Sequence, residues 1–144
     1  PDIAITTDII VGFPGETLAD VEETIDVVKK VQYDNAFTFM YSKRTGTPAA
    51  AMENQVPKEV VREGFDKLLK VVQDTARSRA ALLKGQVMEA LVEEVNEQDA
   101  SLMTGRLSNN MLVHFPADMA MIGKLVKVSL DTCHGFYYTG HIVD

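Results

Sequence analysis

The order of patterns at the start of the chain constrains the fold most strongly. Residues 3–11 (IAITTDIIV) are rich in β-branched side chains and nearly continuously apolar towards their end, which favours a strand covered on both faces. Residues 12–16 (GFPGE) break this run, and Thr17 with Asp20 then resembles a capping box that opens an amphipathic helix. A second β-rich run follows at residues 36–41 (AFTFMY). The segment therefore predicts a βαβ unit with a right-handed crossover.

The rest of the chain changes character twice. Residues 57–84 contain a single glycine and many helix-forming residues, and they predict one long helix. Residues 85–144 predict a small antiparallel barrel, because five short β-rich runs alternate there with turn-forming residues. These runs are residues 87–95, 101–107, 111–115, 125–130 and 136–143. We expect an α/β unit with its linking helix over residues 1–84 and an all-β unit over residues 85–144.

Charge and cysteine content exclude several classes of protein. The net charge of −7 argues against a protein that holds nucleic acid mainly through bulk positive charge. Residues 1–56 and 85–144 each carry a net −5, whereas the helix between them carries +3. One cysteine excludes a disulfide framework, a zinc ribbon and a complete cysteine-ligated iron–sulfur site within these residues.

The hydropathy of the chain and its first residue bear on membrane association and on processing. No apolar run is long enough for a membrane span, and no basic-then-apolar leader is present, so we expect no membrane association. The first residue is Pro1 rather than Met, which leads us to expect a processed chain or a piece of a longer one.

The glycine turn is the first candidate site. Ligands of α/β proteins bind at the carboxyl ends of strands, where Gly12 and Gly15 would permit close backbone approach and helix-end N–H groups would favour an oxygen-rich ligand. The glycine spacing matches neither the dinucleotide fingerprint nor the P-loop, so a plain βα turn that needs positive φ is the more frequent explanation. Asp8 is suited equally to accepting hydrogen bonds from a ligand and to pairing with a neighbouring group.

The last unit holds the remaining candidates. All three histidines, His114, His134 and His141, lie there, and Cys133 precedes His134. This adjacency does not fit common zinc spacings, so a small buried thiol beside an exposed imidazole is the favoured interpretation. Exposed aromatic side chains on a small barrel can stack nucleobases, although core packing is the commoner role of each. The aromatic residues considered are Phe115, Phe136, Tyr137 and Tyr138.

Several segments together resemble the radical S-adenosylmethionine methylthiotransferases. Residues 33–42 (YDNAFTFMYS) favour the branch that acts on N(6)-dimethylallyladenosine in tRNA over the branches that act on threonylcarbamoyl-adenosine or on a ribosomal protein. The last 60 residues resemble the TRAM domain of the family. The matching segments are residues 11–17 (VGFPGET), 36–50 (AFTFMYSKRTGTPAA), 55–73 (QVPKEVVREGFDKLLKVVQ), 102–106 (LMTGR) and 110–116 (NMLVHFP).

The resemblance implies a fold and a reaction. Residues 1–56 would be the last strands of a partial (β/α) radical enzyme barrel, residues 57–84 the linking helix, and residues 85–144 a TRAM barrel that contacts tRNA. One 4Fe-4S cluster would cleave S-adenosylmethionine to a radical that activates carbon 2 of the modified adenine beside the anticodon. A second 4Fe-4S cluster would take part in sulfur delivery, and a second S-adenosylmethionine would supply the methyl group. The protein would be cytoplasmic.

Only part of that machinery carries over to this chain. The C-x-x-x-C-x-x-C motif and the three cysteines of the other cluster are absent, so we expect the cluster ligands to lie outside these residues and the chain alone to be inactive. The S-adenosylmethionine candidates are Asp8, Ile10, Gly12, Phe13, Gly15, Glu16, Tyr41 and Ser42. The RNA-contact candidates are Arg106, Asn109, Lys124 and Lys127, with Lys67, Lys70, Arg77 and Arg79 of the basic helix as alternatives.

Two other functions fit the same residues: a non-catalytic RNA-binding module, and an unrelated α/β enzyme that uses Asp8 and the glycine turn.

Two parallel strands cannot close a barrel, so we also expect exposed apolar surface in residues 1–56, with self-association, domain exchange or disorder there.

Overall fold

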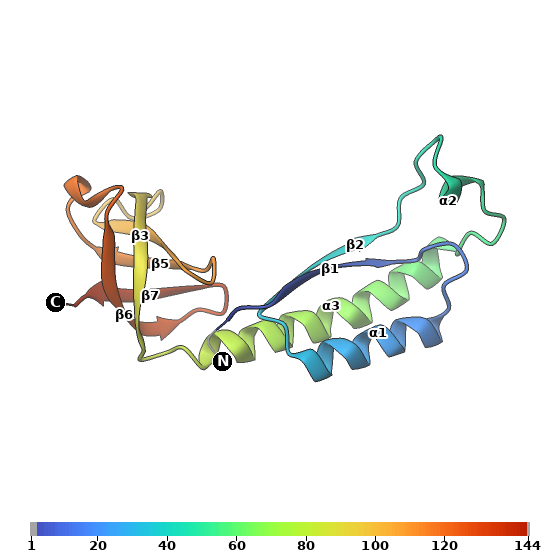
Figure 1. The fold of residues 1–144 in the computed structure, drawn as a ribbon, viewed down its shortest axis with the longest axis horizontal. Helices are drawn as coiled ribbons and strands as arrows, with labels where there is room; N and C mark the ends of the chain where they lie inside the picture. Colours follow the sequence, from blue (N-terminus) through green and yellow to red (C-terminus); the bar gives the residue numbers. More distant parts are fainter. Residues whose placement is uncertain (1–2, 144) are drawn as a thin grey trace. The chain divides into compact units, whose positions relative to one another are not determined.

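The computed structural model describes residues 3–143 and divides into two compact units, one of residues 4–76 and one built mainly from residue 77 onward (Figure 1). The first unit contains β1, α1, β2, α2 and most of α3, and the second contains the end of α3, β3 to β7 and the short 3₁₀ helix η1. The elements are β1 Thr6–Val11, α1 Leu18–Val31, β2 Asn35–Met40, α2 Pro48–Ala51, α3 Lys58–Ala81, β3 Val87–Val95, β4 Leu102–Leu107, β5 Leu112–Pro116, η1 Met119–Met121, β6 Leu125–Cys133 and β7 Tyr137–Ile142.

The first unit is a two-stranded parallel sheet with α1 and α3 packed on one of its faces. β1 and β2 pair in parallel from Thr6 opposite Asn35 to Val11 opposite Met40, which confirms the βαβ prediction. The capping box is also present, since the Thr17 side chain accepts from the Asp20 N–H and the Asp20 carboxylate accepts from the Thr17 N–H. One apolar cluster joins the strands to α1 and α3: Val11, Val21, Ile25, Val28, Ala36, Leu68 and Val72.

The other face of this sheet is uncovered. Side chains alternate along a strand, so Asp8 and Ile10 share a face with their register partners Phe37 and Phe39. Ile10 is 54% exposed and Phe39 is 53% exposed. The expected exposed apolar surface in residues 1–56 is therefore present on this face.

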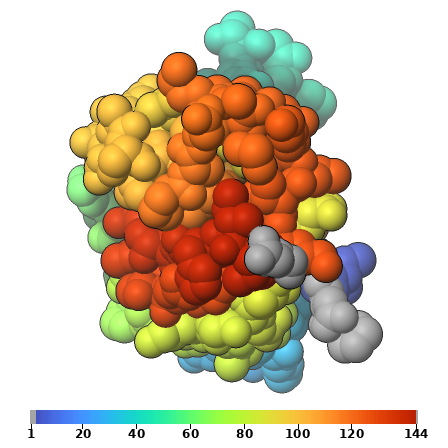
Figure 2. Space-filling view, turned by 90° about the vertical axis from the view of Figure 1, so that its left-hand side faces the viewer, coloured from blue at the N-terminus to red at the C-terminus, as the bar shows by residue number. Residues whose placement is uncertain are grey.

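The second unit is a closed five-stranded barrel of order β3-β4-β5-β7-β6. The expectation of a wholly antiparallel barrel is wrong in one pairing, because β5 and β7 run parallel. The cause is arithmetic: strand directions cannot alternate all the way round a ring of five, so one neighbouring pair must be parallel. Figure 2 looks onto this unit and shows the red surface of β7 adjoining the orange and gold surfaces of the preceding strands.

The barrel interior is filled by large side chains. Phe115 and Tyr138 are fully buried, and the Tyr138 hydroxyl donates to the Ala80 carbonyl of α3 at 2.7 Å. Gly105 makes room for Phe115, since a Cβ there would lie 2.7 Å from the Phe115 Cε1 atom. The end of α3 is thus tied to the barrel by a buried hydrogen bond.

One short helix, α2, was not predicted from the sequence. It is a single turn whose N-cap Thr47 accepts from the Ala50 N–H. Among the described residues, no helix combines the length and apolar character that crossing a membrane requires.

Candidate nucleic-acid interface and cofactor edge

The glycine turn lies at the carboxyl end of β1, and three of its backbone N–H groups already have acceptors within the protein. The Gly12 N–H donates to the Glu16 carboxylate, the Gly15 N–H donates to the Asn54 carbonyl at 2.8 Å, and the Glu16 N–H donates to the Phe13 carbonyl at 2.9 Å. These bonds close the turn on itself. A ligand at this edge would therefore meet carbonyl oxygens and side chains rather than a row of free N–H groups.

Both glycines of the turn are required by local geometry. Gly12 and Gly15 have φ of +86° and +88°, a region that side chains other than glycine rarely adopt. A Cβ on Gly12 would lie 2.5 Å from a Val61 methyl, and one on Gly15 would lie 2.4 Å from the Asn54 amide nitrogen. The structural explanation of these glycines, as a tight βα turn against α3 and its preceding loop, is sufficient on its own.

A pocket of about 720 Å³ opens beside this turn and contains three of the cofactor candidates, Gly12, Tyr41 and Ser42. Within the part of the chain that the structure describes, the Tyr41 hydroxyl is buried and has no hydrogen-bond partner. Phe13 packs edge-on against the Tyr41 ring, with ring centroids 5.5 Å apart. A buried hydroxyl of this kind is satisfied when a ligand or water reaches it.

The other cofactor candidates do not line that pocket. Asp8 and Ile10 lie on the uncovered face of the sheet, next to Phe37 and Phe39. Phe13, Gly15 and Glu16 belong to the turn itself. The structure therefore separates the eight candidates into a pocket group, a sheet-face group and a turn group.

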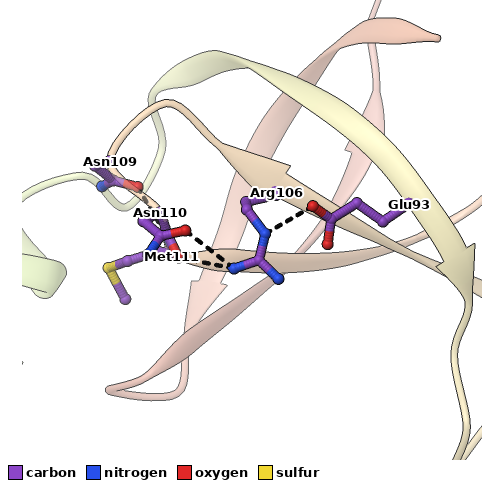
Figure 3. Close-up of polar contacts among 5 residues, drawn as sticks. All are labelled: Glu93, Arg106, Asn109, Asn110 and Met111. Atoms are coloured by element: carbon purple, nitrogen blue, oxygen red, sulfur yellow. Dashed lines mark hydrogen bonds and ion pairs between the residues drawn. The ribbon is translucent and has the colours of Figure 1, made fainter. Parts of the chain in front are cut away.

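Arg106, the first RNA-contact candidate, is held within the barrel surface (Figure 3). Its Nε donates to the Glu93 carboxylate at 2.7 Å, and its Nη1 donates to the Asn110 carbonyl at 3.4 Å and to the Asn110 side-chain oxygen at 3.1 Å. The hydrogen bond to Glu93 raises the pKa of Arg106 and lowers that of Glu93. Much of the positive charge of Arg106 is thus neutralised locally.

Of the other RNA-contact candidates, Asn109 stabilises a turn, whereas Lys124 and Lys127 are exposed at the barrel surface. The Asn109 side-chain oxygen accepts from the Met111 N–H at 3.1 Å and shapes the turn between β4 and β5 (Figure 3). Lys124 and Lys127 are exposed, and Lys127 lies opposite Glu89 in the pairing of β3 with β6. The four candidates therefore do not form one cluster of free cations.

A groove of about 390 Å³ lies on the outside of the barrel, over β4 and β5. In five-stranded OB-type barrels, oligonucleotides bind on the face of the second and third strands and on the adjoining loops; in this barrel those strands are β4 and β5. The groove is lined by Glu94, Asn96, Glu97, Gln98, Asp99, Leu102, Thr104, Leu112, His114, Tyr137 and Thr139.

His114 is the central polar residue of the groove. Asn96 donates through its side-chain nitrogen to the His114 Nδ1 at 3.0 Å, and the Asn96 oxygen is held by the N–H groups of Gln98 and Asp99 at 2.9 Å each. This arrangement makes Nδ1 an acceptor, so Nε2 carries the proton of the neutral ring. Burial, with a smaller contribution from His134, lowers the pKa of His114 below its ordinary value of 6.5.

The sequence alone did not predict this groove. His114 was considered as a metal ligand and Tyr137 as either a base-stacking or a core aromatic, and Thr104 and Thr139 were not considered. The available signal was the period of two, because Leu112 and His114 alternate with the buried Val113 and Phe115. That pattern marks outward positions, but only the strand pairing shows which outward positions meet.

The described residues offer no cluster of three or more His, Cys, Asp or Glu side chains that could hold a metal ion. Cys133, at the end of β6, is a half-buried free thiol that accepts a hydrogen bond from the Gly135 N–H at 3.4 Å. Cys133 is thus less buried than expected, whereas the neighbouring His134 is exposed as expected.

Comparison with known proteins gives one domain match and several close relatives. Residues 81–143 match the TRAM domain. Over its whole length the chain is 57% identical to the tRNA-2-methylthio-N(6)-dimethylallyladenosine synthase of Lachnoclostridium phytofermentans, covering 32% of that protein. It is 50% identical over 143 residues to the synthase of the same name from Acetivibrio thermocellus and 44% identical over 144 residues to that from Moorella thermoacetica, covering 30% and 32% of them.

The chain thus spans roughly a third of the length of the relatives that it matches. Their names agree with the resemblance drawn from the sequence and with the branch that residues 33–42 favour.

Proposed function

We propose that this chain, which carries a TRAM domain and is similar along its whole length to tRNA-2-methylthio-N(6)-dimethylallyladenosine synthases, is the C-terminal part of a tRNA methylthiotransferase. The whole protein would add a methylthio group to carbon 2 of N(6)-dimethylallyladenosine beside the anticodon. The observation that carries the proposal is the 57% identity over all 144 residues, which spans both units and not the barrel alone.

In this proposal the chemistry uses S-adenosylmethionine and two 4Fe-4S clusters. The residues of this chain do not fit the clusters, because a single cysteine cannot supply their thiolate ligands. S-Adenosylmethionine fits better, because the pocket beside the glycine turn is lined by Gly12, Ser42 and Tyr41, and the buried Tyr41 hydroxyl has no partner among the described residues. These three residues would hold the cofactor at the carboxyl edge of the sheet.

The sheet-face and turn groups would have different roles. Asp8 and Ile10 would face the interior of the complete (β/α) barrel, because their side of the sheet is uncovered in this unit. Glu16 would hold the glycine turn through its bond to the Gly12 N–H. The barrel unit would bind tRNA in the cytoplasm, where its substrate is found.

The test is a chimera. The segment of the Lachnoclostridium phytofermentans synthase that matches this chain is replaced by the chain itself, and the chimera is expressed in a bacterium that lacks its own synthase. Mass spectrometry of nucleosides from total tRNA then measures the ratio of methylthio-dimethylallyladenosine to dimethylallyladenosine. We expect the methylthio nucleoside to be restored, and we expect the same synthase without the segment to give none.

Nucleoside mass spectrometry, together with mass spectrometry of the ribosomal proteins from the same cells, separates the rival functions. Methylthiolation of threonylcarbamoyl-adenosine in the first, or of a ribosomal protein in the second, would reassign the substrate within the family. A chimera that is soluble and holds its clusters but modifies no substrate would contradict the proposal and favour a non-catalytic RNA-binding module.

A further inference from the structure

The outer face of the barrel brings together side chains that are far apart in sequence. Strand pairing sets Thr104, His114 and Thr139 in one row, across β4, β5 and β7. The next row contains Leu112 and Tyr137, and the tyrosine ring lies against the His114 imidazole with centroids 5.0 Å apart and ring planes tilted by 52°. Planar rings therefore form one wall of the groove, with small hydroxyl groups beside them.

The tyrosine ring is held in place before any ligand arrives. His134 stacks on Tyr137 with an interplanar angle of 11° and a centroid distance of 4.6 Å, and the His134 ring is bonded to the Thr139 hydroxyl at 3.2 Å. Tyr137 remains 36% exposed. A fixed, partly exposed ring loses little rotamer freedom on binding, which suits it to stacking a nucleobase.

The charge of the groove is the opposite of what a phosphate site requires. Glu94, Glu97 and Asp99 line it and are exposed, and one Asp99 oxygen already accepts from the Ser101 N–H and hydroxyl. Arg106, which lies opposite Leu112 in the strand pairing, is paired with Glu93. Carboxylates repel phosphate but accept hydrogen bonds from the amino groups of bases, as Glu and Asp do from the N4 amine of cytosine. The neutral imidazole and the Asn96 amide add uncharged polar contacts.

We propose that this groove binds an unpaired nucleobase that presents an amino group, with the base stacked on Tyr137 beside the His114 ring and its amine directed to Glu94 or Glu97. Phosphates of the same RNA strand lie outside the groove. The inference deepens the proposed function by giving the tRNA-binding unit a base-selective site, and it rests on that function.

Binding of short single-stranded RNA to the whole chain tests the inference. Fluorescence anisotropy compares oligocytidylate with oligouridylate of equal length, since the two pyrimidines differ in an amine against a carbonyl at carbon 4. We expect oligocytidylate to bind about fivefold or more tightly. We expect Tyr137→Ala to weaken binding of both by about fivefold to a hundredfold through loss of stacking.

Replacing the carboxylates tests the base selection separately. The double variant Glu94→Gln, Glu97→Gln should reduce the preference for cytosine to near unity. The charge-matched control is the double variant Glu23→Gln, Glu59→Gln on helices α1 and α3, which should keep the preference for cytosine. The aromatic control is Phe136→Ala, whose ring does not line the groove and whose loss should leave binding unchanged. An equal gain in affinity for both RNAs in the groove variant would identify a phosphate path and overturn the inference.

A second readout does not depend on affinity. An oligonucleotide containing 2-aminopurine should lose fluorescence on binding the native chain, because stacking quenches this base, and should keep it with Tyr137→Ala. If tRNA binds but base preference and fluorescence quenching are unchanged in the groove variants, only the assignment of the groove as the base-binding site fails. If no RNA binds at all, the proposed tRNA-binding role of the barrel fails with it.

Discussion

At the scale of single residues, Arg106 shows how a cation favoured by the sequence becomes part of the scaffold. Its guanidinium is committed to Glu93 and Asn110. We predict that Glu93→Gln slightly destabilises the barrel and raises tRNA affinity by up to about fivefold, because it releases a charge within reach of phosphate. Thermal denaturation and tRNA titration at fixed salt measure the two effects. Unchanged affinity would show that Arg106 has no access to RNA.

His114 carries a pH prediction. Burial and His134 lower its pKa below 6.5, so the folded barrel favours the neutral ring. The unfolded chain then binds the proton more readily, and the contribution of His114 to stability is complete above pH 6.5 and is lost as the pH falls through the folded pKa. NMR titration of the His114 ring should give a pKa under 6.5. A value above it would mean that Glu94 and Glu97 outweigh burial.

Glycine positions in the barrel can be ranked by what a methyl group would meet. Gly105→Ala would press on the Phe115 ring, which can shift, so we expect a loss of about 1–3 kcal/mol. Gly140→Ala would place a Cβ 1.9 Å from the Ser129 carbonyl oxygen, where backbone must move, so we expect a larger loss. Urea denaturation of both variants measures the order, and the reverse order would contradict the packing described for β6 and β7.

At the scale of elements, one buried hydroxyl bonds the end of α3 to the barrel, beside the core packing of Ala80. Tyr138→Phe removes the 2.7 Å hydrogen bond to the Ala80 carbonyl and should cost about 1–3 kcal/mol, since that carbonyl loses its hydroxyl donor. Tyr137→Phe, which alters a more exposed ring, is the matched control and should cost much less. Equal losses in the two variants would remove the special role of Tyr138.

The elements themselves could be predicted well from the sequence, and the site could not. The β3 run matches residues 87–95, and the α1 helix begins just after Thr17, because hydrophobic period and capping residues are local signals. The parallel pairing of β5 with β7 depends on barrel closure, which no local pattern encodes. The groove depends on that same pairing, so His114 and Tyr137 could not be placed together beforehand.

At the scale of the whole molecule, the two units have separate cores that share no residue. The uncovered face of β1 and β2 exposes Ile10, Phe37 and Phe39, so we predict that the chain self-associates with rising concentration. Sedimentation velocity should show the association, and Phe37→Ser with Phe39→Ser should reduce it. A monomer at all concentrations would mean that this face needs no partner.

We propose that RNA binds the outer face of the barrel unit, over β4, β5 and β7. Chemical-shift mapping of the ¹⁵N-labelled chain with an anticodon stem-loop RNA locates the binding face residue by residue. We expect the largest amide shifts at Asn96, Thr104, His114, Tyr137 and Thr139. Shifts confined to α3 or to the Lys124 and Lys127 segment, with those five amides unmoved, would place RNA binding elsewhere and rule the proposal out.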